Sequence, residues 1–207
     1  MQALRPSFSI EKFFARMKSS DTRVLMLDYD GTLAPFHASP TEAVPYAGVI
    51  PLLDEIMAAG HSRVVIVSGR WAKDLLPLIG LERRPELWGS HGWERLHADD
   101  EYESARVRPG AVELLVDVDE WSGEIESLGG RVERKPAGIA FHWRGLSEKR
   151  ATSIRDALAS KWSAFAGTEA VEWHDFDGGI ELRAAGRNKG DAVRTLIAEA
   201  GQDAVMA

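Results

Sequence analysis

The stretch VLMLDYDGTLAPF, residues 24–36, joins four apolar residues to two aspartates, Asp28 and Asp30, which are followed by Gly31 and Thr32. A short run that is apolar on both faces is typical of a central strand in a parallel sheet. Residues i and i+2 of an extended segment project to the same side, and open α/β sheets bind ligands at the carboxyl ends of their strands. The stretch therefore predicts that both carboxylates lie in one site.

Two carboxylates this close are costly unless a cation neutralises them or one of them carries a proton. Gly31 allows a sharp turn, after which free backbone N–H groups can hold an anion, and Thr32 adds a hydroxyl donor. A hard cation such as Mg²⁺ together with a phosphate satisfies the whole arrangement. In isolation the pattern is equally typical of an ordinary turn, since Asp and Gly are common turn residues.

A second strand and two helices follow this stretch. Residues 46–59 have the pattern of a helix, and 63–67 (RVVIV) form an apolar run that ends at Ser68. This strand–helix–strand order predicts a βαβ unit. The Ser68 hydroxyl can bind a phosphate oxygen, although a serine at this position is also a common helix N-cap. A further helix is expected over 71–79 and a third short strand over 87–91, before a polar stretch rich in turn residues.

From residue 109 the pattern changes from parallel to antiparallel. Two helix-like stretches, 109–127 and 147–165, are each followed by two strands with a glycine-containing turn between them. The expected strands are 131–135 and 139–143 after the first helix, and 171–174 and 180–183 after the second. Hairpins of this kind imply antiparallel pairing. We therefore expect an α/β core formed by residues 20–108 and 184–207, with an α+β module inserted at 109–183.

The core pattern resumes with a helix over 189–200, which Asn188 can cap. Lys189 opens this helix, where a cation opposes the helix dipole. That conflict suggests that Lys189 holds a phosphate and a carboxylate, the alternative being a solvated surface lysine. Residues 205–207 resemble the start of another strand.

The composition excludes several functional classes. The chain has 207 residues, 44% of them hydrophobic, no cysteine and a formal net charge of −7. Thiol catalysis, disulfides and zinc–thiolate sites are therefore excluded, and a reducing cytoplasm is the expected location. The acidic balance argues against nucleic acid or a membrane surface as a partner, and no pattern in the sequence sets an oligomeric state.

Taken in order, the segments LDYDGTLAPF, VIVSGR and GRNKGDAV resemble the first three motifs of the haloacid dehalogenase (HAD) superfamily of phosphatases. The segments GSHGWER, VERKPAGIAFHWRG and GGIELRAAGRNKG resemble signatures of one family within it, the trehalose-6-phosphate phosphatases. This resemblance covers about residues 22–207. It implies a HAD-like Rossmannoid parallel sheet core with an inserted α+β cap of αββαββ order.

The resemblance also implies roles for individual residues. Asp28 attacks phosphorus to form an aspartyl-phosphate, and Asp30 protonates the leaving sugar oxygen and later deprotonates water. Mg²⁺ is bound by the Asp28 carboxylate and the Asp30 carbonyl. The transferring phosphoryl group is held by Thr32, Ser68, Gly69 and Lys189.

The cap of this family closes over a small-molecule sugar phosphate, and the residues matching its sugar contacts are Glu133, Lys135, Arg144 and Glu181. Glu133 and Lys135 share a face of one predicted strand. The alternative for these four residues is a solvated sheet face. Arg70, His91 and Gly92 are also expected to contact the substrate.

The predicted function is Mg²⁺-dependent hydrolysis of trehalose 6-phosphate. The alternatives are a HAD phosphatase for another sugar phosphate and a non-catalytic sugar-phosphate-binding fragment. The superfamily's fourth motif, an acidic cluster that completes the Mg²⁺ site, is expected after Ala207. We therefore expect a fragment with weak Mg²⁺ binding, poor activity and low stability.

Overall fold

The computed structural model describes residues 9–165, 167–201 and 203–207. The core is organised around β2 (Arg63–Val67), whose side chains alternate between two apolar clusters. Val64 and Ile66 pack into the cluster on one face of the sheet, and Val65 and Val67 pack into the cluster on the other. The all-apolar run in the sequence is therefore a strand that is covered from both sides, as expected for a parallel sheet.

Within the described ranges, the core sheet has the strand order β10–β1–β2–β3–β4–β5. The pairs formed by β10, β1, β2 and β3 are parallel, and those that add β4 and β5 are antiparallel. Besides β2, its strands are β1 (Arg23–Leu27), β3 (Glu86–Gly89), β4 (Glu94–Leu96), β5 (Tyr102–Ser104) and β10 (Val205–Met206).

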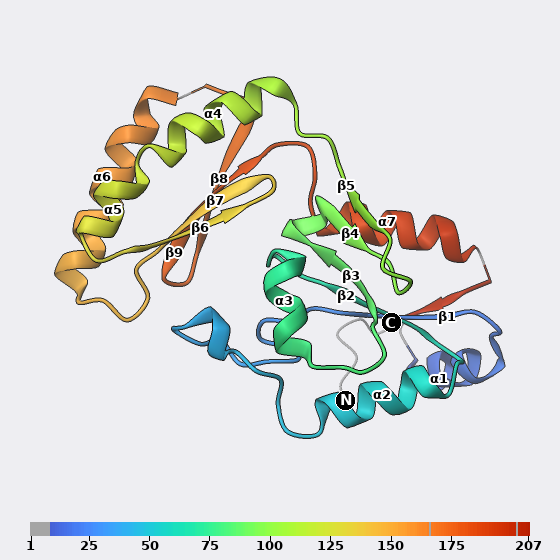
Figure 1. Cartoon of the computed structure of the whole chain (residues 1–207). Coiled ribbons are helices and arrows are strands. Elements are labelled where there is room, and N and C mark those ends of the chain that lie inside the picture. Colours follow the sequence, from blue (N-terminus) through green and yellow to red (C-terminus); the bar gives the residue numbers. More distant parts are fainter. Residues whose placement is uncertain (1–8, 166, 202) are drawn as a thin grey trace.

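Helices cover both faces of this sheet (Figure 1). Leu53 of α2 (Val49–Ala58) and Leu75 of α3 (Ala72–Ile79) join the cluster on one face, and Leu196 of α7 (Lys189–Ala200) joins the cluster on the other. The remaining elements of the core are α1 (Ile10–Ser19) and the short 3₁₀ turns η1 (Pro40–Glu42) and η2 (Ser90–Gly92). No described helix combines the length and the apolar composition needed to cross a membrane.

The polar stretch after the third strand differs from the sequence-based expectation of a turn-rich region. It forms β4 and β5, and the predicted strand 87–91 ends at Gly89. The charged residues of β4 are buried because each has a partner: Arg95 Nε donates to Glu86 (2.8 Å), and Glu94 accepts from the Ser90 hydroxyl (2.7 Å).

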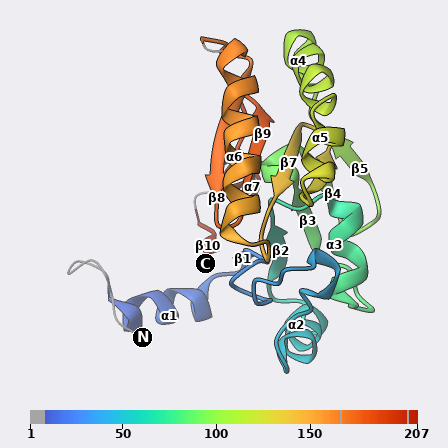
Figure 2. The ribbon, with the colours of Figure 1, turned by 90° about the vertical axis from the view of Figure 1, so that its left-hand side faces the viewer.

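The inserted cap is an antiparallel sheet with helices on one side. Its strand order is β6–β7–β9–β8. The strands are β6 (Arg131–Lys135), β7 (Gly138–His142), β8 (Val171–Phe176) and β9 (Gly179–Ala184), and the helical segments are α4 (Pro109–Asp119), α5 (Ser122–Ser127), α6 (Glu148–Trp162) and η3 (Ser163–Phe165). Figure 2 views the cap from its helical side. The prediction of an α/β core with an αββαββ cap is confirmed.

The predicted helix 109–127 is broken into α4 and α5. Trp121 lies at the break, where its indole is buried and stacks on Phe141 of the cap sheet with ring centroids 6.4 Å apart. The turn allows this large ring to enter the cap core, so the continuous helical pattern in the sequence gives way to tertiary packing.

Candidate active site

A cleft of about 390 Å³ lies between the carboxyl ends of the core strands and the cap sheet. Most of the predicted site residues line it: Asp28, Asp30, Gly69, Arg70, His91, Glu133, Lys135, Arg144, Glu181 and Lys189. The fold thus brings together carboxylates and cations that are widely separated along the chain.

Three predicted site residues lie beside this lining rather than in it. Thr32 is exposed in the turn after Asp30. Ser68 is buried, and its hydroxyl accepts a hydrogen bond from the Arg70 backbone N–H (3.1 Å). Gly92 is buried too, and its carbonyl accepts from Arg187 (3.0 Å).

The two aspartates are held in the cleft by the tyrosine between them. Tyr29 is fully buried, and its hydroxyl donates to the Ala43 carbonyl (2.7 Å). Burial of this ring raises the pKa of Tyr29 to about 12. Tyr29 lies in the turn that follows β1, and its anchored ring holds this turn in place while Asp28 and Asp30 on either side of it line the cleft.

Lys189 lies against Asp28, with Nζ 2.7 Å from Oδ2. The helix that carries Lys189 begins with a capping box, in which Asn188 accepts from the Gly190 N–H and Asp191 accepts from the Asn188 N–H. This cap fixes the start of α7, so Lys189 is presented to the aspartate from a defined position. Its place opposite Asp28 accounts for a cation at a helix N-terminus.

Arg70 binds both oxygens of Asp30. Its Nε lies 2.8 Å from Oδ2 and its Nη2 lies 2.7 Å from Oδ1, while Nη1 donates to the Pro40 carbonyl (2.8 Å). Burial alone lowers the pKa of Arg70, but the hydrogen bonds to Asp30 outweigh burial and raise it. The guanidinium therefore stays charged and holds the second aspartate in a bidentate pair.

His91 lies in a strained turn, in which both Ser90 (φ 47°) and His91 (φ 58°) adopt the left-handed conformation. The imidazole packs directly over Gly69, where an added Cβ would meet it at 2.4 Å. Only glycine leaves room for this contact. Since non-glycine residues seldom adopt such φ values, the turn is held by its surroundings and marks a candidate functional position.

His91 also connects the core to the cap. Its Nε2 lies 3.0 Å from the Glu181 carboxylate. Burial lowers the pKa of His91 more than Glu181 raises it, so we assign a neutral ring that donates Nε2–H. Burial alone raises the pKa of Glu181, yet the hydrogen bond from His91 and the charge of Lys135 outweigh it and lower the value to about 2.

The cap side of the cleft is a chain of paired charges. Lys135 Nζ lies 2.9 Å from Glu181 and 3.7 Å from Glu133, and His142 Nε2 lies 2.9 Å from Glu133. Burial acts to raise the pKa of Glu133, but His142 and Lys135 lower it to about 2. These groups present both donors and acceptors to the cavity, which suits a ligand with many hydroxyl groups.

The aspartates fit a magnesium ion by the chemistry of their oxygen atoms. Among the described residues, no group of three or more His, Asp or Glu side chains is arranged to hold a metal on its own. Mg²⁺ usually keeps several waters and takes one or two carboxylates together with substrate phosphate oxygens. The Asp28 carboxylate and the Asp30 backbone carbonyl are therefore suited to a magnesium ion that water and a phosphate help to coordinate.

The cleft contains residues that we did not predict as site residues from the sequence. They are Phe36, His37, Ala38, Pro40, Arg131, His142, His174, Asp175, Phe176 and Arg183. Strand alternation was the available signal for some of them: Arg131 shares a face with Glu133, and Arg183 shares one with Glu181. The two phenylalanines had no such signal.

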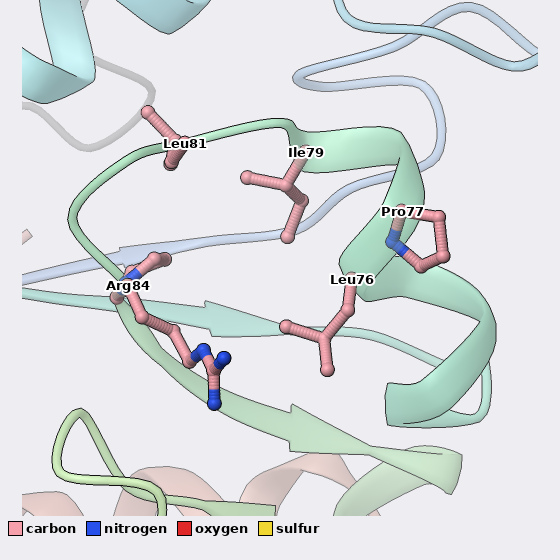
Figure 3. A pocket seen from close by; sticks show the side chains of 6 residues that line it. Leu76, Pro77, Ile79, Leu81 and Arg84 are labelled. Atoms are coloured by element: carbon pink, nitrogen blue, oxygen red, sulfur yellow. The ribbon is translucent and has the colours of Figure 1, made fainter.

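A second hollow lies at the opposite end of α3 (Figure 3). Its lining consists of Leu76, Pro77, Ile79, Leu81, Arg84 and Pro85. It offers no carboxylate or histidine in its lining for general acid–base chemistry. The cleft between core and cap is therefore the better candidate for an active site.

Comparison with known proteins also points to a phosphatase. The trehalose-phosphatase family model matches residues 26–206. The chain belongs to the trehalose-phosphatase family. A bifunctional trehalose-6-phosphate synthase/phosphatase from Thermoproteus tenax is 31% identical over 204 residues, which are 95% of this chain and 27% of that protein. A trehalose-phosphate phosphatase from Mycobacterium ulcerans is 30% identical over 77% of this chain and 43% of its own length.

This member of the family thus spans less than half the length of those two curated relatives. Among solved structures, the C-terminal domain of a C. albicans trehalose-6-phosphate phosphatase aligns with a TM-score of 0.71 at 22% identity, covering 96% of this chain and 69% of that one. A haloacid dehalogenase-like hydrolase from B. subtilis aligns with a TM-score of 0.55 at 12% identity, covering 85% of this chain and 78% of that one. These likenesses establish the HAD-like fold.

Proposed function

We propose that this chain hydrolyses trehalose 6-phosphate to trehalose and phosphate through an aspartyl-phosphate on Asp28. The observation that carries the proposal is the meeting of Asp28, Asp30 and Lys189 with the cap charges Glu133 and Glu181 in one cleft. Its support from relatives is the family match and the names of the curated proteins.

In the first proposed step, an Asp28 oxygen bonds to phosphorus while the bond from phosphorus to the sugar oxygen breaks. Asp30 gives its proton to that oxygen, and trehalose leaves. In the second step, a water oxygen attacks the phosphorus of the aspartyl-phosphate, and Asp30 takes the water proton. The bond from phosphorus to Asp28 breaks, which releases phosphate and restores both carboxyl groups.

The pairing of Asp30 with Arg70 bears on the first step. Both Asp30 oxygens accept hydrogen bonds from Arg70. An oxygen that is to deliver a proton to the leaving sugar has to give up this partner. We therefore propose that substrate binding separates Asp30 from Arg70 and that Arg70 then contacts the substrate.

The remaining roles concern charge and position. Lys189 stabilises the phosphoryl charge, with Thr32, Ser68 and Gly69 supplying further hydrogen-bond donors. The Asp28 carboxylate and the Asp30 backbone carbonyl would hold Mg²⁺, which would supply positive charge for the phosphoryl group. On the cap, Glu133, Lys135, Arg144 and Glu181 bind the sugar hydroxyls at the cleft, with His91 and Gly92 on the core side.

The small molecule acted on is thus a sugar phosphate, and no nucleic acid or membrane partner is proposed. The lack of cysteine in the sequence is compatible with the reducing cytoplasm, which we propose as its location.

The test is phosphate release from trehalose 6-phosphate, sucrose 6-phosphate and glucose 6-phosphate, each with Mg²⁺ and with a chelator. We expect the highest kcat/KM for trehalose 6-phosphate, with loss of activity in the chelator. Asp28→Asn should abolish release while circular dichroism shows an unchanged fold. A preference for another sugar phosphate overturns the substrate, and full activity of Asp28→Asn overturns the mechanism.

A further inference from the structure

Two phenylalanines lie in a cleft whose lining is otherwise mostly charged. Phe36 comes from the loop after β1 and is 66% exposed, and Phe176 ends β8 of the cap and is 37% exposed. A single exposed apolar side chain needs no explanation. Two of them in one charged cavity, one from the core and one from the cap, form an apolar feature that calls for a ligand.

The Phe36 side chain contacts the turn after Asp30 on the core side and Arg144 on the cap side. An added Cβ at Gly31, where φ is +79°, would meet the Phe36 ring at 2.8 Å, so the ring packs directly on the turn that follows Asp30. The Arg144 guanidinium lies over the same ring, 5.6 Å from its centroid. The ring therefore has one neighbour in the core and one in the cap, while most of its surface is open.

Phe176 is placed by the cap hairpin. Its ring packs over Gly179 and meets His142 edge-on, with ring centroids 5.2 Å apart. Arg144 connects the two phenylalanines, because it binds Asp177 in the turn after Phe176 and reaches over Phe36. The arginine that we propose as a sugar contact thus touches the Phe36 ring and the residue that follows Phe176.

A pyranose ring has the surface that such a feature requires. Its rim carries hydroxyl groups, which the charged residues of the cleft can bind, and its faces carry C–H groups that water solvates poorly. Burying the open part of an aromatic ring against a C–H face is favourable, as in ligand sites that combine apolar walls with a few polar groups. Asp28 and Lys189 of the same cleft are the residues that we propose act on the phosphate of such a ligand.

We infer that Phe36 and Phe176 form an aromatic binding surface for a pyranose ring and determine specificity for sugar phosphates over phosphates of small acyclic alcohols. This inference rests on the proposed function, because it assigns the rings to the sugar part of the same substrate.

The experiment compares kcat/KM for trehalose 6-phosphate with kcat/KM for glycerol 2-phosphate. We expect Phe36→Leu and Phe176→Leu each to lower the ratio of the two values by about tenfold, because leucine keeps apolar bulk but loses the flat face. Phe36→Tyr keeps the ring and should hold the ratio within about threefold of wild type. Phe14→Ala is the matched control, because Phe14 is also exposed (41%) and lies on α1 away from the cleft.

An unchanged ratio in both leucine variants overturns the inference, as does an equal loss on both substrates, which indicates a purely structural role. If wild type prefers another pyranose phosphate, the proposed substrate fails, and the same variants are judged on that sugar. If wild type releases no phosphate at all, calorimetric binding of trehalose 6-phosphate decides: weaker binding in the leucine variants supports the inference, and equal binding overturns it.

Discussion

Lys189 and Asp28 form the contact on which the site depends at the scale of single residues. The strand-end position of Asp28 and the place of Lys189 at a helix start were readable from the sequence, because both follow from the geometry of parallel sheets and helix dipoles. The bidentate pair of Arg70 and Asp30 could not be predicted from the sequence. It depends on where the Ser68–Arg70 turn lies after folding, as do the positions of Phe36 and Phe176.

Replacing Lys189 tests this contact. Lys189→Met removes the cation 2.7 Å from Asp28, so we expect kcat/KM for trehalose 6-phosphate to fall by about two to three orders of magnitude. Lys189→Arg keeps the charge and should retain more activity than Lys189→Met. Activity of Lys189→Met within tenfold of wild type is incompatible with the role assigned to this residue.

At the scale of elements, Glu94 of β4 joins α3, η2 and β5. It is 1% exposed, and it accepts hydrogen bonds from the Ala72 N–H at the start of α3 (2.9 Å), the Ser90 hydroxyl (2.7 Å) and the Tyr102 hydroxyl of β5 (3.1 Å). The sequence did not indicate β4 and β5 because both are short and carry charged residues. Those charges are tolerated inside because each finds a partner.

Glu94→Leu should therefore destabilise the fold. It leaves the Ala72 N–H and the Ser90 hydroxyl buried without an acceptor, and we expect the free energy of unfolding to fall by about 2–5 kcal/mol, measured by urea denaturation. Tyr102→Phe is the matched control. It removes the donor to Glu94 Oε2 but leaves the Ala72 N–H and the Ser90 hydroxyl paired with Oε1, so it should cost less than Glu94→Leu. A loss below about 1 kcal/mol in Glu94→Leu would refute this role.

At the scale of the whole molecule, the insertion of a cap could be predicted from the repeated helix–strand–turn–strand pattern. The way in which the cap sits on the core could not be predicted, because it depends on contacts between distant segments. His91 reaches Glu181 across the cleft, and Arg144 reaches Phe36. Such contacts leave no periodic signal in a sequence.

The two buried glutamates of the cap should make the free energy of unfolding fall at acid pH. The pKa values of Glu133 and Glu181 are lowered to about 2 in the folded state. Their stabilising contribution is therefore complete above the unfolded value of 4.5 and is lost as pH falls toward 2. Each can contribute up to about 3 kcal/mol.

Urea midpoints measured from pH 6 to pH 2 should show this loss, and the decline should be smaller in Glu181→Gln, because the side chain no longer titrates. A wild-type midpoint that stays constant down to pH 3 contradicts the assignment of these two glutamates as buried, ionised groups.

The most direct test of the proposed mechanism is to trap the phosphoryl group on Asp28. Asp30→Asn cannot take a proton from water, but p-nitrophenyl phosphate has a leaving group that needs no protonation, so the first step still proceeds. After mixing, acid quench and digestion, we predict that mass spectrometry finds one phosphoryl group on the peptide containing Asp28, and none when Asp28→Asn is added to the variant. Phosphoryl transfer to another residue, or release of phosphate without any labelled peptide, would contradict the role of Asp28 as the nucleophile.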